Sequence, residues 1–198
     1  MSDEKRLIEL MVLYQAGRPE AFNEFYRQVK SKLYKFLIVK CLDRQLAEDL
    51  LQETFLQIHR SRRTYLPGKP VTPWIFSIAH HVFLSERRAR MKRKTREEGL
   101  EDHLRDFPVP PDIEATAETE LLKSVLTRLP PEQRESLLLH HYWGFSFREI
   151  AATLGIRTVT AKLRAHRGLK KIREYLNIGD VTEHGSKANK NIYDSNLK

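Results

Sequence analysis

The chain has 198 residues and a formal net charge of +9 at pH 7. The excess of lysine and arginine indicates a polyanionic partner, nucleic acid first of all. A single cysteine, Cys41, excludes an internal disulfide and is typical of a reducing compartment. The N-terminus lacks a signal-peptide core, and no apolar run approaches the roughly 20 residues that span a bilayer. We therefore expect a cytoplasmic protein.

Apolar residues at three- and four-residue spacing predict four helices in the first part of the chain. These residues run from Leu7 to Tyr14, from Phe22 to Leu37, from Leu46 to Ile58 and from Trp74 to Phe83. The helix boundaries are indicated by residues that favour helix ends and starts. They are Gly17 after the first helix, Pro19 in the first turn of the second, Asp43 as cap of the third, and Thr72 as cap of the fourth with Pro73 at its first position.

A basic loop precedes the fourth helix of this part, and the helix itself ends in a basic run. Residues 61–71, SRRTYLPGKPV, form a predicted loop that combines cations, an aromatic ring and two prolines. Seven of the ten residues from 87 to 96 are basic. Acidic residues and prolines without apolar periodicity follow over 97–115 and predict a linker.

Helical periodicity returns near Leu121, and two prolines at 130 and 131 separate two further helical segments. Ser146 and Glu149 then form a capping box, and Gly155 can end the short helix that follows it. A longer helix is predicted from Thr158, with one apolar stripe that begins with two alanines. That stripe consists of Ala161, Ala165, Leu169, Ile172 and Leu176.

A short helix, a glycine turn and a basic helix are typical of a helix-turn-helix. The basic stripe opposite the apolar one consists of Thr160, Arg164, Arg167 and Lys171. Arginine and lysine can read guanine in the major groove and neutralise phosphates. The alternative interpretation is a solvated basic helix on an ordinary bundle.

No alternating strand pattern occurs, so the fold class is all-α, with two small helical domains joined by a flexible linker. The predicted organisation is residues 1–96, a linker over 97–115, a helix-turn-helix domain over 116–176, and a disordered tail over 177–198. Two modest DNA contacts on one tether gain from effective concentration, so neither domain needs to bind tightly alone.

Four segments in order resemble the extracytoplasmic-function sigma factors, the small initiation subunits of bacterial RNA polymerase. These segments are residues 47–60, 72–88, 129–156 and 162–174. The resemblance implies that the first domain is sigma region 2, which binds core polymerase and recognises and melts the −10 promoter element. It implies that the second domain is sigma region 4, which binds the −35 element.

The resemblance also implies docking on the polymerase β′ coiled coil and β flap, and an anti-sigma partner. The candidate surface for core polymerase is a polar face of the third helix that consists of Asp49, Gln52, Glu53 and Gln57. Carboxylates on such a face can pair with basic residues of a partner helix. The alternative is a plain solvated face.

The candidate −10 residues lie in the loop and in the helix after it. They are Arg62, Arg63, Tyr65, Lys69, His81, Arg87 and Arg88. Cations can follow a DNA backbone, and Tyr65 can stack on an unpaired base. His81 occupies a position where relatives often have asparagine, which leaves the preferred base open; the alternative for His81 is packing between helices.

The resemblance assigns base contacts in the −35 element to Lys162, Leu163, His166 and Arg167. Only Arg167 also belongs to the basic stripe, and the two sets differ by about a quarter-turn of helix. Arg164 and Lys171 are then expected to contact phosphates. An exposed Leu163 can meet a thymine methyl group.

Two other function classes fit the sequence less well. A stand-alone helix-turn-helix regulator would need no surface at 49–57 followed by an aromatic-basic loop. A metal-dependent enzyme would need a ligand cluster, whereas His80–His81 and His140–His141 are adjacent pairs that do not chelate alone. The sequence thus predicts no catalytic residue, metal or cofactor.

Overall fold

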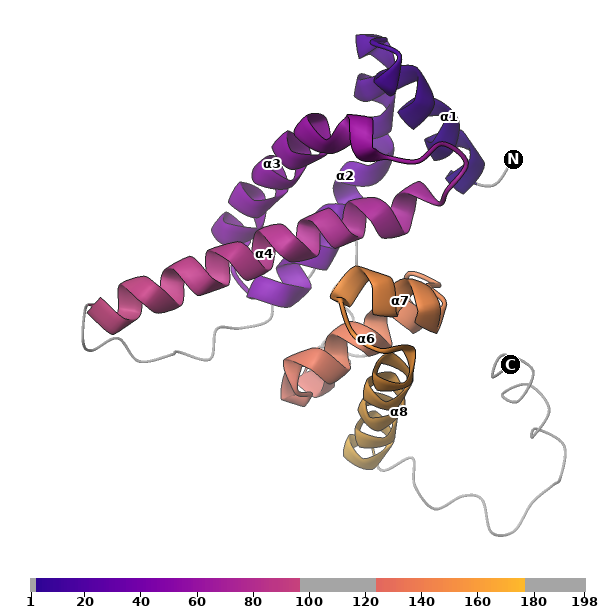
Figure 1. The fold of residues 1–198 in the computed structure, drawn as a ribbon. Coiled ribbons are helices and arrows are strands. Elements are labelled where there is room, and N and C mark those ends of the chain that lie inside the picture. Colours follow the sequence, from indigo (N-terminus) through magenta and orange to yellow (C-terminus); the bar gives the residue numbers. More distant parts are fainter. Residues whose placement is uncertain (1–2, 97–123, 177–198) are drawn as a thin grey trace, which may run out of the picture.

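The computed structural model describes residues 3–96 and 124–176, and its regular elements in these ranges are helices (Figure 1). They are α1 (Asp3–Gln15), α2 (Pro19–Cys41), α3 (Arg44–Ser61), a 3₁₀ turn η1 (Arg62–Thr64), α4 (Val71–Arg96), α6 (Pro131–His141), α7 (Phe147–Leu154) and α8 (Thr158–Tyr175). Residues 124–128 are also helical. The all-helical prediction is confirmed for the described residues, while the predicted linker and tail lie outside them.

Most predicted helix boundaries are confirmed because they rest on local hydrogen bonding. The Asp43 side chain accepts a hydrogen bond from the Leu46 amide, and α2 begins at Pro19. Ser146 and Glu149 form a complete capping box at the start of α7. Gly155 ends α7 with φ of +64°, a left-handed conformation that glycine adopts without strain.

The start of α4 differs from the prediction. The helix begins at Val71, one residue before the expected cap Thr72. Its first amides are satisfied by a side chain from a distant helix. The Glu4 carboxylate of α1 accepts hydrogen bonds from the amides of Val71 and Thr72 and from the Thr72 hydroxyl. A carboxylate at a helix N-terminus is also favoured by the helix dipole.

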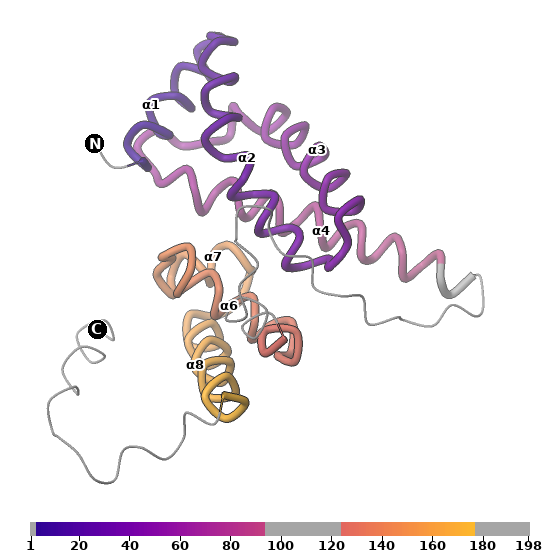
Figure 2. The backbone as a smooth tube through the Cα atoms, turned by 180° about the vertical axis from the view of Figure 1, so that it is seen from behind, coloured from indigo at the N-terminus to yellow at the C-terminus, as the bar shows by residue number. Residues whose placement is uncertain are grey.

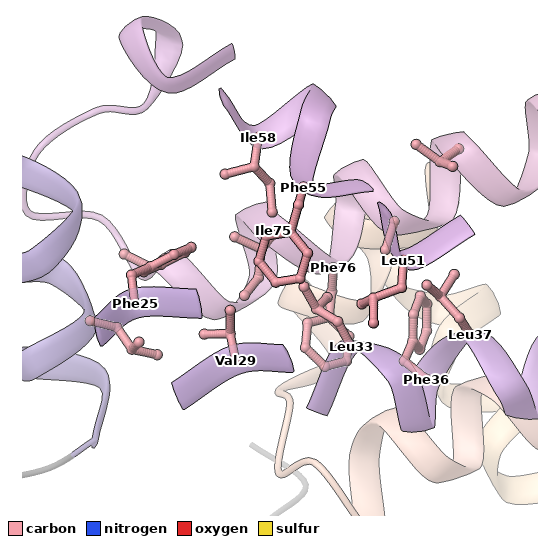
Figure 3. Packing of buried hydrophobic residues seen from close by; sticks show 14 of the residues in the cluster. Phe25, Val29, Leu33, Phe36, Leu37, Leu51, Phe55, Ile58, Ile75 and Phe76 are labelled. Carbon is pink, nitrogen blue, oxygen red and sulfur yellow. The ribbon is translucent and has the colours of Figure 1, made fainter. Parts of the chain in front are cut away.

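Helices α1, α3 and α4 pack around α2 (Figures 1 and 2). The α2 residues Phe25, Val29 and Leu33 are fully buried, and Ile58 of α3 and Ile75 of α4 meet them in one core (Figure 3). Each buried residue follows from the apolar stripe of its helix.

Helices α6, α7 and α8 form the second helical unit. Ala161 and Ala165 of α8 are buried, as the small-residue stripe predicted. Gly168 extends that stripe, because a Cβ atom there would lie 3.2 Å from the Gln133 carbonyl oxygen of α6. The small residues therefore bring α6 and α8 into close contact.

The two helical units contact each other directly. Helix α7 packs on α4, and α6 reaches α2 (Figure 2). The main buried cluster includes residues of both units, among them Phe36 and Phe76 from the first and Phe145 and Ile150 from the second. The main cluster thus spans both units, and a second, smaller cluster of Leu126, Leu129 and Leu137 lies within the second unit.

The contact from Glu4 to α4 can be tested by substitution. Glu4→Ala removes the acceptor for two α4 amides, so we expect the free energy of unfolding to fall by about 1 kcal/mol. Chemical denaturation followed by circular dichroism measures this change. Glu48→Ala, which removes an exposed carboxylate, is the control and should change stability by less than about 0.5 kcal/mol. Equal effects of the two substitutions would contradict the capping role.

Candidate nucleic-acid and polymerase interfaces

Helix α8 is held in place by its apolar side and by the turn before it. Ile156, just after Gly155, packs against the main core, and Ala161 and Ala165 are buried beneath the first half of the helix. The opposite side of this half faces solvent. The turn and the small residues therefore fix which α8 side chains are presented outward.

The outward face of α8 matches the set inferred from the family resemblance. Lys162, Leu163, His166 and Arg167 are all exposed, and the Leu163 side chain is 47% exposed despite being apolar. The other three residues of the basic stripe are less exposed than Arg167. Thr160 and Lys171 are half-buried, and Arg164 forms an ion pair with Glu132 of α6 at 2.6 Å. Arg164 therefore already has a carboxylate partner in this conformation.

The loop after α3 is ordered by contacts with α1. The Gln15 side-chain amide donates to the carbonyl oxygens of Arg62 and Tyr65, at 2.6 and 2.8 Å. The Arg62 guanidinium donates to the His59 carbonyl oxygen and lies over the Tyr14 ring, 5.7 Å from its centroid. Arg63 and Lys69 are exposed. Of the three predicted loop cations, two thus extend into solvent and one helps to fold the loop.

The prediction that Tyr65 presents its ring to an unpaired base does not fit this conformation. Its side chain belongs to the core, with a residue exposure of 2%. The ring packs on Trp74, with centroids 5.3 Å apart, and the hydroxyl donates to the Lys69 carbonyl oxygen. Burial raises the pKa of the Tyr65 hydroxyl. An aromatic residue between cations resembled a stacking platform, but its ring closes the loop instead.

The predicted −10 residues of α4 lie on its exposed surface. Arg87 and Arg88 are exposed. His81 is exposed rather than packed between helices, and its Nδ1 lies 2.6 Å from the Ser77 carbonyl oxygen. Arg90 and Arg93 each contact Glu86 at 2.9 Å, so part of the basic run is already paired.

The predicted polymerase-binding residues of α3 lie along two different grooves. A groove of about 780 Å³ between α3 and α4 is lined by Asp49, Glu53 and Gln57 and also by His81 and Glu86. Gln52 lies instead on a smaller apolar groove. That second groove is lined by Phe22, Tyr26, Leu51, Gln52, Phe55, Leu56 and His59. Sequence spacing alone placed all four residues on one face, whereas the packing of α2 and α4 divides them.

Glu86 and the apolar groove were not predicted as parts of a site. In the sequence Glu86 directly precedes a run of mostly basic residues. Only the packing of α3 on α4 shows that it lines the same groove as Asp49 and Glu53. Among the described residues no cluster of three or more histidine, cysteine or acidic side chains could hold a metal ion. The helices described here also include none that is long and apolar enough to cross a membrane.

Comparisons with known proteins identify both helical units. The family model for Sigma-70 region 2 matches residues 21–93, and the model for Sigma-70, region 4 matches residues 119–172. Together the two models account for more than half of the chain.

Curated relatives agree with these matches along most of their length. The RNA polymerase sigma factor CarQ of Myxococcus xanthus is 34% identical over 166 residues, which are 84% of this chain and 95% of CarQ. The ECF RNA polymerase sigma factor SigE of Mycolicibacterium smegmatis is 33% identical over 82% of this chain and 63% of SigE. SigM of Bacillus subtilis is 28% identical over 79% of this chain and 96% of SigM.

Solved structures show a similar fold. The sigma factor RpoE of Bartonella quintana, in complex with the anti-sigma factor NepR, superposes with a TM-score of 0.70 at 25% identity, over 79% of this chain and 97% of RpoE. CnrH, in complex with the cytosolic domain of CnrY, superposes with a TM-score of 0.63 at 21% identity, over 87% and 98% of the two chains.

The buried position of Tyr65 gives a testable prediction. Tyr65→Ala removes a core ring and should lower the free energy of unfolding by about 3 kcal/mol or more. Tyr65→Phe keeps the ring and loses one hydrogen bond, so its loss should be about 1 kcal/mol. Urea denaturation compares the two variants. Wild-type stability of Tyr65→Ala, together with a selective loss of single-stranded DNA binding, would instead support an exposed stacking role.

Proposed function

The chain belongs to the extracytoplasmic-function sigma factors of bacterial RNA polymerase, and we propose that its two domains divide promoter recognition between the surfaces described above. As an alternative sigma factor it initiates transcription and is not itself an enzyme. Sigma factors bind core RNA polymerase and promoter DNA. The observation that carries the proposal is the pairing of an outward basic face on α8 with an acidic groove on the other domain.

In the proposed −35 complex, α8 enters the major groove of duplex DNA. Lys162, His166 and Arg167 are exposed and can donate to base edges, while the exposed Leu163 side chain can contact a thymine methyl group. Lys171 and Arg164 would contact phosphates, and Arg164 would exchange its Glu132 partner for one. Phosphate contacts set the register of α8, and base contacts set its sequence preference.

In the proposed −10 complex, the loop and α4 form a basic surface for DNA. Arg63 and Lys69 would follow the single-stranded backbone, and Arg87 and Arg88 the adjoining DNA. Arg62 and Tyr65 shape the loop from within rather than contact the DNA. The exposed His81 would lie beside an extruded base.

Core polymerase would bind at the groove that contains Asp49, Glu53 and Gln57. The Asp49 and Glu53 carboxylates attract a basic partner, so this part of the groove suits a protein helix such as the β′ coiled coil. Gln52, on the neighbouring apolar groove, would extend the contact, and the second domain would meet the β flap. The similar sigma factor RpoE, whose co-crystal structure holds the anti-sigma factor NepR, supports an anti-sigma partner for this chain as well.

The proposal places the chain in the cytoplasm, with the polymerase and the chromosome. A stand-alone helix-turn-helix regulator is the less supported function, because it leaves the region 2 domain and its acidic groove without a role. Adding purified protein to sigma-free core polymerase and DNA from its own genome separates the two functions. Transcripts that start at discrete sites support a sigma factor; DNA binding without polymerase association or initiation contradicts it.

The α8 assignment predicts the effect of removing one arginine. Arg167→Ala should weaken specific binding to the −35 element by about 1–3 kcal/mol and relax the sequence preference at one position. Competition binding with matched and mismatched duplexes measures both effects. Arg173→Ala removes the same charge from an exposed position later in α8 and should weaken all duplexes equally. An unchanged preference in Arg167→Ala would rule out a base contact.

The α3 assignment predicts the effect of reversing one charge. Asp49→Lys places a cation where a basic partner helix is expected, so affinity for core polymerase should fall at least about tenfold. The dissociation constants are measured from the binding of the purified variants to surface-immobilised core enzyme. Glu174→Lys makes the same charge change on an exposed residue of α8 and serves as control. Wild-type affinity of Asp49→Lys would place the core contact elsewhere.

A further inference from the structure

The loop between α3 and α4, residues 62–70, is held by helix α1 at both of its ends (Figures 1 and 2). At the start of the loop, the Gln15 side-chain amide donates to the carbonyl oxygens of Arg62 and Tyr65, at 2.6 and 2.8 Å. At its end, the Glu4 carboxylate accepts hydrogen bonds from the first amides of α4. Glu4 and Gln15 lie near opposite ends of α1. One helix therefore fixes both ends of the loop.

The partners of Gln15 determine the orientation of its amide group. Carbonyl oxygens only accept hydrogen bonds, so the side-chain nitrogen, which carries two hydrogens, must face both of them. The two bonds join one α1 side chain to the peptide of Arg62, in the 3₁₀ turn η1, and to that of Tyr65, directly after η1. They therefore set the direction in which the chain leaves η1.

Local contacts make the tip of the loop a compact turn. The Lys69 amide donates to the Leu66 carbonyl oxygen at 3.2 Å, and Gly68 has φ of +83°. Proline followed by a glycine with positive φ is typical of a type II turn, with Pro67 and Gly68 as its central residues. The Tyr65 hydroxyl donates to the Lys69 carbonyl oxygen and closes this turn. The tip is therefore expected to move as one unit, with a direction that depends on the contacts at the loop ends.

The loop presents two cations outward. Arg63 and Lys69 are both exposed, and such cations can pair with the phosphates of single-stranded DNA. Binding costs less free energy when the protein groups already have the bound arrangement. A loop with a fixed direction should therefore bind the strand more tightly than a loop that samples many directions.

Other contacts secure the fold around Gln15. The neighbouring Tyr14 is buried in the core, its hydroxyl forms a hydrogen bond with His59 Nδ1, and its ring lies under the Arg62 guanidinium. Gln15 is the last residue of α1 and is half-buried. Replacement of Gln15 should therefore loosen the loop without unfolding α1 or α3.

We propose that Gln15 is a positioning residue for recognition of the −10 element: by fixing the direction of the loop, it aligns Arg63 and Lys69 with the backbone of the separated strand. This inference rests on the proposed function, because it takes the loop as a contact for single-stranded DNA. Gln15 acts through the loop and does not touch the DNA. Its effect belongs to the step in which the strands separate, and not to the earlier binding of duplex DNA by α8.

Amide hydrogen exchange tests the contact in the free chain. Gln15→Leu keeps a side chain of similar size and removes both hydrogen bonds to the loop. Exchange of the loop amides should then be at least about fivefold faster, while exchange in α2 and α3 stays unchanged. Gln28→Leu is the matched control, because it removes a half-buried glutamine amide of α2 that donates to Glu24 and not to the loop.

Initiation kinetics separate the two steps of promoter binding. The variants are combined with core polymerase on a promoter mapped by wild-type transcription, and the affinity of the initial complex is measured apart from the rate of strand opening. Gln15→Leu should slow strand opening at least about fivefold, because a smaller fraction of the loops has the competent direction. The affinities for the initial complex and for an isolated −35 duplex should stay within about twofold of wild type. A contact that only supports the fold would lower both affinities as well.

A double-mutant cycle tests whether Gln15 acts through the loop cations. Arg63→Ala/Lys69→Ala removes the two exposed cations that the loop presents. If Gln15 aligns them, Gln15→Leu should slow strand opening less in this background than in the wild type. Equal slowing in both backgrounds would contradict a positioning role.

Two further results would overturn the proposal. One is faster exchange in the loop of Gln15→Leu together with a wild-type rate of strand opening. The other is unchanged exchange in the loop with helical circular dichroism intact. If Gln15→Leu loses its helical signal, Gln15→Glu replaces it, because glutamate has the same shape and its carboxylate lacks the donors. Failure of the wild type to initiate with core polymerase would contradict the proposed function, whereas hydrogen exchange would still test the contact between Gln15 and the loop.

Discussion

The apolar stripe of α2 is the constraint on which the rest of the structure depends. Helix α2 contacts α1, α3, α4 and α6, and its buried residues recur at three- and four-residue spacing from Phe25 onward. The first part of the stripe organises the four-helix domain. Phe36, near its end, contacts both Phe76 of α4 and Trp143 of the second domain. One helix therefore orients α4 and its proposed DNA-facing residues, and its end also packs against the second domain.

Burial and pairing assign different tasks to cations that look alike in the sequence. Lys40 is enclosed by Glu135 and two aromatic rings, with its Nζ 4.7 Å from the Phe83 ring centroid and 5.0 Å from that of Phe36. Arg62 folds a loop by donating to a backbone carbonyl. Arg167 has solvent around it. Because desolvation makes a buried charge dependent on its partner, only cations of the third kind remain free to exchange water for phosphate or base.

The sequence predicted features whose cause is local, and the structure was needed where the cause is distant in the chain. Asp43 caps its own helix, and Ser146 and Glu149 are three residues apart, so both could be recognised from spacing. Glu4 and the α4 amides it caps are separated by more than 60 residues, and no local pattern indicates that contact. The candidate site residues show the same difference between local and distant causes. The outward face of α8 came from family resemblance, whereas burial of Tyr65 and division of the α3 face depend on tertiary packing.

A buried ion pair between domains specifies an arrangement more than it stabilises one. Apolar contacts such as those of Trp143 with Phe36 and Phe76 would tolerate small rotations of one domain on the other, because dispersion and burial have little directionality. Glu135 tolerates them poorly: it must reach Lys40 and His80 together, or a charge is left buried without a partner. The same requirement selects one orientation of the second domain on the first.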